Sequence, residues 1–160
     1  MHRLRLVAVL TLVVGLVAAR VGPVSAATAP NPKVCAEVAV AKQANNDAEG
    51  ARFDSGDNAE KAFRATLQRS AKLLVAAHQS LVKLVAKPDR PGVAYALSRL
   101  KDLDSLLRKS TDSTALGIYS KWSTKDVANF DVSDARNSYL AFMPTSSKSC
   151  GQGSFRVFLI

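Results

Sequence analysis

Residues 58–109 read NAEKAFRATLQRSAKLLVAAHQSLVKLVAKPDRPGVAYALSRLKDLDSLLRK, and they carry the clearest structural pattern of the sequence. Two long segments without proline or glycine are separated by the sequence PDRPG at residues 88–92. At 100° per residue, each segment places its apolar side chains on one side. These side chains are Phe63, Leu67, Leu74, Ala77, Leu81 and Val85 in the first segment, and Val93, Ala96, Leu97, Leu100, Leu103 and Leu107 in the second.

This spacing predicts helices over about 58–87 and 92–109. The connector is short, so the two helices should pack antiparallel. Asp57 or Asn58 is suited to cap the first helix, and Pro88 is expected to end it. The sequence therefore predicts an all-α fold, a small helical bundle built on this antiparallel helix hairpin.

Three weaker helices are predicted around the hairpin. The helix over about 34–48 has an alanine-rich apolar face, which indicates close approach to a neighbouring helix. Residues 111–122 are expected to form a short helix, and residues 133–143 another that ends at Pro144. The tail, residues 145–160, ends in a short apolar run that we expect to pack on the core.

Residues 1–26 have the pattern of a cleavable signal peptide. Arg3 and Arg5 precede an apolar stretch over 6–19, and small residues lead to an expected cut after Ala26. A retained membrane anchor is the alternative, but the apolar stretch is shorter than the roughly 20 residues that a spanning helix needs. We therefore expect a secreted protein, or one on the exterior of the cell envelope.

Residues 27–160 are expected to form a single helical domain with an extended C-terminal tail and no transmembrane segment. The whole sequence has a net charge of +9. Three of its 22 Lys and Arg residues lie before residue 27, so 19 remain against 13 acidic residues, a net charge of about +6. The exported chain is therefore basic.

Cys35 and Cys150 are the two cysteines of the sequence. In an oxidising compartment an even pair is expected to form a disulfide. There is no C-x-x-C motif, and His78 is the one histidine after residue 26, so a metal site is not expected.

No catalytic motif is present. The sequence lacks H-E-x-x-H, G-x-S-x-G and G-x-x-x-x-G-K. The scattered carboxylates fit helix caps, loops and partners for nearby bases better than a glycosidase pair. We therefore expect a protein that is not an enzyme and that uses no cofactor.

His78 lies at the edge of the apolar stripe of the first long helix. We expect a boundary histidine whose ring packs while one nitrogen reaches water. The alternative is a ligand to a haem-like group in an interhelical cleft, with Tyr95, Tyr119, Tyr139 or Met143 as a conceivable second ligand. Nothing in the spacing selects one of these.

Basic residues follow the polar side of the hairpin. Lys61, Lys72 and Lys83 recur every eleven residues and return almost to the same angle of the helix. The candidate face for an anionic partner consists of Lys61, Arg64, Lys72, Lys83 and Lys87. The alternative is a solvated helix face balanced by the acidic residues of 34–60.

The sequence does not identify the partner of this face; an anionic envelope component, whether polymer or lipid, or an acidic protein would suit it. Nucleic acid is not expected, because the basic stripe has no interleaved aromatic residues for base stacking. The sequence thus favours an exported helical binding protein. A carrier of a small apolar or haem-like ligand is the alternative.

Overall fold

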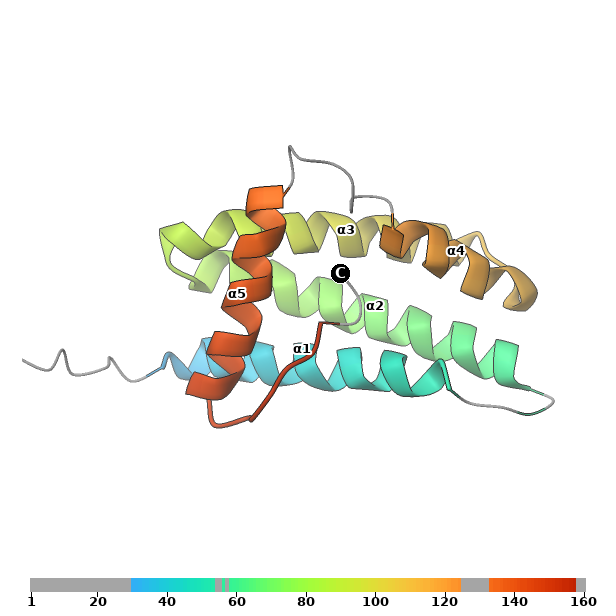
Figure 1. Ribbon diagram of the computed structural model, residues 1–160, viewed down its shortest axis with the longest axis horizontal. Helices are drawn as coiled ribbons and strands as arrows, with labels where there is room; N and C mark the ends of the chain where they lie inside the picture. The colour runs from blue at the N-terminus through green and yellow to red at the C-terminus, as the bar shows by residue number, and fades with distance from the viewer. Residues whose placement is uncertain (1–29, 54–55, 57, 125–132, 158–160) are drawn as a thin grey trace, which may run out of the picture.

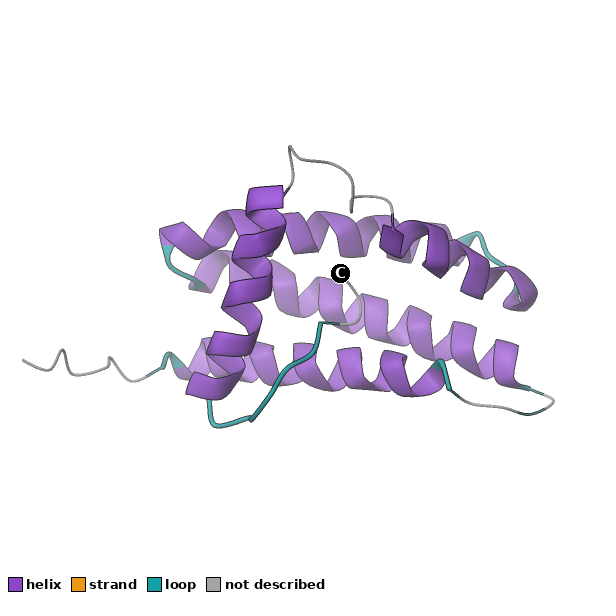
Figure 2. Cartoon of the chain, viewed as in Figure 1, coloured by secondary structure: helices purple, strands orange, loops and turns teal. Residues whose placement is uncertain are grey.

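The computed structural model of the protein describes residues 30–53, 56, 58–124 and 133–157 (Figure 1). Within these ranges the chain forms five α-helices, one short 3-10 helix and no strand (Figure 2). They are α1 (Pro32–Ala51), α2 (Ala59–Leu84), η1 (Lys87–Asp89), α3 (Arg90–Arg108), α4 (Asp112–Thr124) and α5 (Ser133–Ser149). The predicted all-α class is confirmed. The predicted signal peptide lies outside the described residues.

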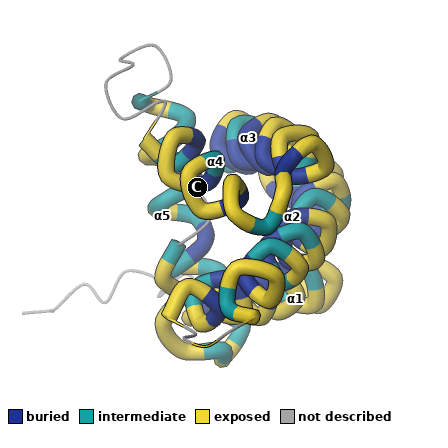
Figure 3. Tube along the Cα trace, turned by 90° about the vertical axis from the view of Figure 1, so that its right-hand side faces the viewer, coloured by how far each residue is buried: buried dark blue, intermediate teal, exposed yellow. Residues whose placement is uncertain are grey.

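Helices α1, α2 and α3 lie side by side along the long axis of the molecule, and α5 crosses over one face of this layer (Figure 1). Helix α4 packs against α2 and α3 at the end away from α5. Seen end-on, the outward sides of α1, α2 and α3 are exposed, and their buried residues face inward (Figure 3). The outward side of α2 is therefore turned away from α5.

The predicted hairpin forms the centre of the core. Each residue expected on its inner sides is buried, apart from the half-buried Leu97. Because fully burying one such aliphatic side chain contributes about 1.5–3 kcal/mol, this shared stripe is the main stabilising element of the fold.

Helix α1 packs on α2 through small side chains. Ala41, Ala44 and Ala48 are fully buried, and Asn45 lies beside them with 2 % of its surface exposed. The side chain of Asn31 caps the helix by accepting a 3.0 Å hydrogen bond from the backbone N–H of Lys33. The predicted close approach of this helix to a neighbour is confirmed, although the helix is longer at both ends than expected.

The connection between α2 and α3 differs from the predicted one. The first helix ends at Leu84, because the backbone of Val85 is extended. Pro88 lies in η1, and α3 begins at Arg90, with a proline in its first turn. A proline at that place has no N–H to leave unsatisfied and a φ already suited to the helix.

Helix α5 does not end at Pro144 as expected but continues through it to Ser149. An interior proline costs one backbone hydrogen bond and crowds the preceding turn, about 3 kcal/mol. Contacts on both sides of the proline offset this cost. Tyr139 and Met143 are buried before it, and Ser147 is buried after it and donates a hydrogen bond to Gly153 O.

Two contacts fix α3 against the last two helices. A Cβ on Gly92 would lie 2.6 Å from the backbone nitrogen of Tyr139, so only glycine permits the crossing of α3 and α5. The buried guanidinium of Arg99 lies over the Trp122 ring, 4.4 Å from its centroid, and donates to Trp122 O. The indole Nε1 of Trp122 donates back to Arg99 O at 3.0 Å. The pair therefore combines a cation–π contact with reciprocal hydrogen bonds.

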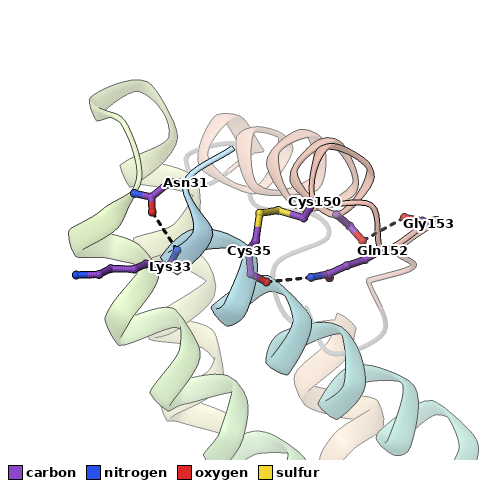
Figure 4. Close-up of a disulfide and its surroundings, with 7 residues drawn as sticks. Asn31, Lys33, Cys35, Cys150, Gln152 and Gly153 are labelled. Carbon is purple, nitrogen blue, oxygen red and sulfur yellow. Dashed lines mark hydrogen bonds between the residues drawn. A yellow bond between two sulfur atoms is a disulfide. The ribbon is translucent and has the colours of Figure 1, made fainter. Parts of the chain in front are cut away.

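A disulfide joins Cys35 to Cys150, with their Cα atoms 5.4 Å apart (Figure 4). It connects the first turn of α1 to the residue after α5, and Gln152 adds a hydrogen bond from its amide to Cys35 O. The predicted pairing is confirmed.

The described part of the tail runs along α1 after the disulfide. Lys42 donates to Gln152 O, Asn45 donates to Arg156 O at 2.6 Å, and Phe155 is buried. The expectation that the tail packs on the core holds for residues 150–157. No helix within the described ranges is long and apolar enough to cross a membrane.

Candidate functional site

The outward side of α2 carries a row of four exposed cations, Lys61, Arg69, Lys72 and Lys83, which we call the cationic strip. Their positions fall within an arc of about 80° at 100° per residue. From Lys61 to Lys83 the strip extends for about 33 Å at 1.5 Å per residue. It is therefore a line of charge along one helix.

No acidic residue occurs between Lys61 and Pro88 in the sequence. The usual partners for a helical lysine, acids three or four residues away, are thus missing along most of α2. The described part of the chain contains no ion pair to any member of the cationic strip. With respect to the described residues, these four charges face solvent.

Arg64, predicted as part of the basic face, is placed differently. It is half-buried toward the junction of α3 and α4, where it donates to Ser110 Oγ at 3.1 Å and to Asp112 Oδ1 at 3.3 Å. Gln68 donates to Leu107 O at 2.8 Å beside it. Arg64 therefore ties α2 to the end of α3 by contacts within the protein.

Lys87 is exposed but lies in η1, past the extended residue Val85, so it is outside the straight row on α2. Arg69, which is not among the residues predicted for the basic face, lies three residues before Lys72 and is exposed beside it. The helical angle is the sequence signal that could have placed Arg69 on this face. Arg69 lies about 60° around the helix from Lys72, and it is farther from the buried stripe than Arg64 is.

The surface between these cations is smooth. Ala62, Ala65 and Ala76 are exposed along the row, and Leu73, 43 % exposed, is the large apolar side chain there. No aromatic residue lies on the exposed side of α2. The strip therefore presents charge with small apolar side chains and the uncharged Gln79 between the cations.

Two shallow hollows separate the strip from α1. One is lined by Lys83 together with Lys33 and Glu37. The other is lined by Arg69 together with Asp47. Carboxylates therefore border the strip on its α1 side without forming ion pairs with it.

His78 is completely buried, which corrects the expectation of a boundary histidine with one nitrogen in water. Its Nδ1 lies 2.7 Å from Leu74 O, and its Nε2 lies 2.8 Å from the Tyr139 hydroxyl. Because a carbonyl can only accept, Nδ1–H donates to Leu74, and Nε2 accepts from Tyr139. The sequence did not reveal this because the partner comes from α5, 61 residues away.

Burial lowers the pKa of His78 to about 4, and its hydrogen bond to Leu74 opposes this shift. Burial also raises the pKa of the Tyr139 phenol well above its usual range. The imidazole is therefore neutral at physiological pH, and both ring nitrogens are used within the core. It has no nitrogen left for an iron or a substrate.

A hollow of about 430 Å³ lies between α3 and α4. Its lining brings together Asp102 and Lys121 with Ser105, and its apolar part includes Leu106 and Trp122. Among the described residues, no hydrogen bond joins Ser105 to Asp102 or Lys121. Within the described ranges, no group of three His, Cys, Asp or Glu side chains could hold a metal ion.

The sequence matches no model of a known protein family, and neither curated proteins nor solved structures show a match to it.

Proposed function

We propose that the protein is an exported, non-enzymatic binding protein that holds an anionic partner against the cationic strip of α2. The observation that carries the proposal is the row of four exposed cations, none ion-paired within the described chain. Like charges on one helix face repel one another, and a bound anion relieves this repulsion.

Export is part of the proposal. It is supported by the signal pattern of residues 1–26 and by the disulfide between Cys35 and Cys150. A disulfide of this kind persists in oxidising compartments and is rare where thiols are kept reduced.

The alternative, a carrier of a haem-like ligand, lacks such support. His78 would have to give up either Leu74 or Tyr139 to bind iron, and its ring is fully buried. No observation on the described residues favours haem binding over the binding of an anion at the cationic strip.

The test compares two fourfold variants of equal net charge. The strip variant is Lys61→Gln, Arg69→Gln, Lys72→Gln and Lys83→Gln. The control variant is Lys109→Gln, Lys121→Gln, Lys148→Gln and Arg156→Gln, all at exposed positions outside the strip.

Retention on a phosphate-bearing matrix during a salt gradient is the measurement. The strip variant should elute at much lower salt than the native protein, and the control variant should shift far less. Equal shifts of the two variants would show that total charge alone governs binding, and the proposal would fail.

A further inference from the structure

We infer that the partner of the cationic strip is a linear polyanion, a flexible chain with a phosphate, sulfate or carboxylate on each repeating unit. The inference rests on the proposed function and names its partner. Three features of the strip select a chain over a small anion or an anionic lipid bilayer.

The first feature is the spacing of the cations. Along α2, Lys61 and Arg69 are about 12 Å apart, Arg69 and Lys72 about 4.5 Å, and Lys72 and Lys83 about 16 Å. A charge-assisted hydrogen bond to an anion is about 2.8 Å long, so one phosphate cannot contact the whole row. A ligand that uses all four cations must therefore carry several charges over about 33 Å.

The second feature is the width of the strip. On the α1 side, Glu37 and Asp47 line the hollows beside it. On α3, Arg108 donates to Asp104 at 2.9 and 2.6 Å, which neutralises both groups locally. Carboxylates thus lie beside the row on both neighbouring helices, so the positive charge of the strip forms a narrow line along α2. This is the shape of a chain, whereas a bilayer presents its charge over a plane.

The third feature is the lack of side chains that enter a membrane. Interfacial helices insert bulky apolar residues such as Trp, Phe and Leu between the lipids. The exposed apolar side chains of α2 are Leu73 and three alanines, Ala62, Ala65 and Ala76. These small residues let a polymer backbone lie close to the helix between cations. Without an aromatic platform there is also no stacking of nucleobases.

Isothermal titration calorimetry of the purified protein, as isolated after export, tests the inference. The probes are long-chain inorganic polyphosphate, triphosphate, and vesicles of equal parts phosphatidylglycerol and phosphatidylcholine. Polyphosphate should bind, and a fourfold rise in salt should weaken it roughly fifty-fold if four contacts each release about 0.7 counterion. Triphosphate and vesicles should bind far more weakly.

The strip variant should lose polyphosphate binding and the control variant should keep it, with unchanged helical circular dichroism in both. Triphosphate binding as tight as the polymer would overturn the inference, because a single cluster would then suffice. Strip-dependent binding to vesicles but not to polyphosphate would also overturn it, while leaving the proposed function in place. Absence of strip-dependent binding to every probe would overturn both.

Discussion

His78 and Tyr139 form a buried pair that makes the stability of the protein depend on pH. The pKa of His78 is about 4 in the folded chain, against 6.5 for the free side chain. The unfolded state therefore binds more protons between these values, so stability is full above pH 6.5 and falls as the pH drops toward 4. At one pKa unit per 1.36 kcal/mol, the loss is on the order of 3 kcal/mol.

Denaturant unfolding at pH 7, 6, 5 and 4 measures this loss. Acidic groups also begin to titrate near pH 4, so the matched control is His78→Leu, which has no proton to gain. The control should be less stable at pH 7 but should show a much flatter profile between pH 6.5 and 4. Parallel profiles for the two proteins would contradict the assignment of the pH dependence to His78.

Gly92 is a second residue whose identity the fold requires. A Cβ at this position would lie 2.6 Å from the backbone of Tyr139, which cannot move without shifting α5. Gly92→Ala should therefore lower the free energy of unfolding by about 1–3 kcal/mol.

Gly117→Ala is the control for Gly92. It also lies within a helix, but a Cβ there would meet nothing within 4 Å. That substitution should stabilise the protein by about 0.5–1 kcal/mol, because alanine loses less backbone entropy in a helix. Thermal unfolding of both variants gives the comparison, and equal effects would argue against the close crossing of α3 and α5.

At the scale of elements, the alanine face of α1 sets its distance from α2. Ala44 is fully buried there, so Ala44→Leu should force the helices apart and destabilise the protein by about 1–3 kcal/mol. Ala39→Leu, at an exposed position of the same helix, should change stability by about 0.5 kcal/mol or less. Chemical unfolding of the two variants measures the difference; similar values would mean that α1 is loosely packed.

The buried sides of the helices could be predicted because an amphipathic pattern repeats locally every 3.6 residues. Leu67, Leu81 and Leu103 are at the centre of such stripes, and all three are fully buried. The ends of the helices are harder to predict from the sequence, because contacts with other parts of the chain can override a local stop signal. Pro144 is a strong local stop signal, yet buried groups on both sides keep α5 continuous through it.

In the candidate site, too, local spacing predicts some positions, whereas contacts distant in the sequence decide others. Lys61, Lys72 and Lys83 were predictable as one exposed row from their spacing alone. Arg64 has a similar local pattern, but Ser110 and Asp112 from the α3–α4 junction draw it inward. Contacts between segments 46 or more residues apart leave no local signal in the sequence.

For the whole molecule, the disulfide closes a loop between residues 115 positions apart. In the chain-entropy account such a loop contributes about 4–5 kcal/mol by restricting the unfolded state. The double variant Cys35→Ser and Cys150→Ser should therefore unfold at much lower denaturant while remaining helical under native conditions.

A reducing agent gives the matching comparison. It should lower the unfolding midpoint of the native protein toward that of the double variant and leave the double variant unchanged. If the midpoint of the native protein did not move on full reduction, the tail contacts along α1 would suffice without the disulfide.

A backbone amide NMR titration with long-chain polyphosphate shows whether α2 is the binding face. The largest chemical-shift changes should lie between Lys61 and Lys83, and they should diminish as the salt concentration is raised. Changes concentrated in α4, α5 or the tail, with α2 unaffected, would contradict binding at α2.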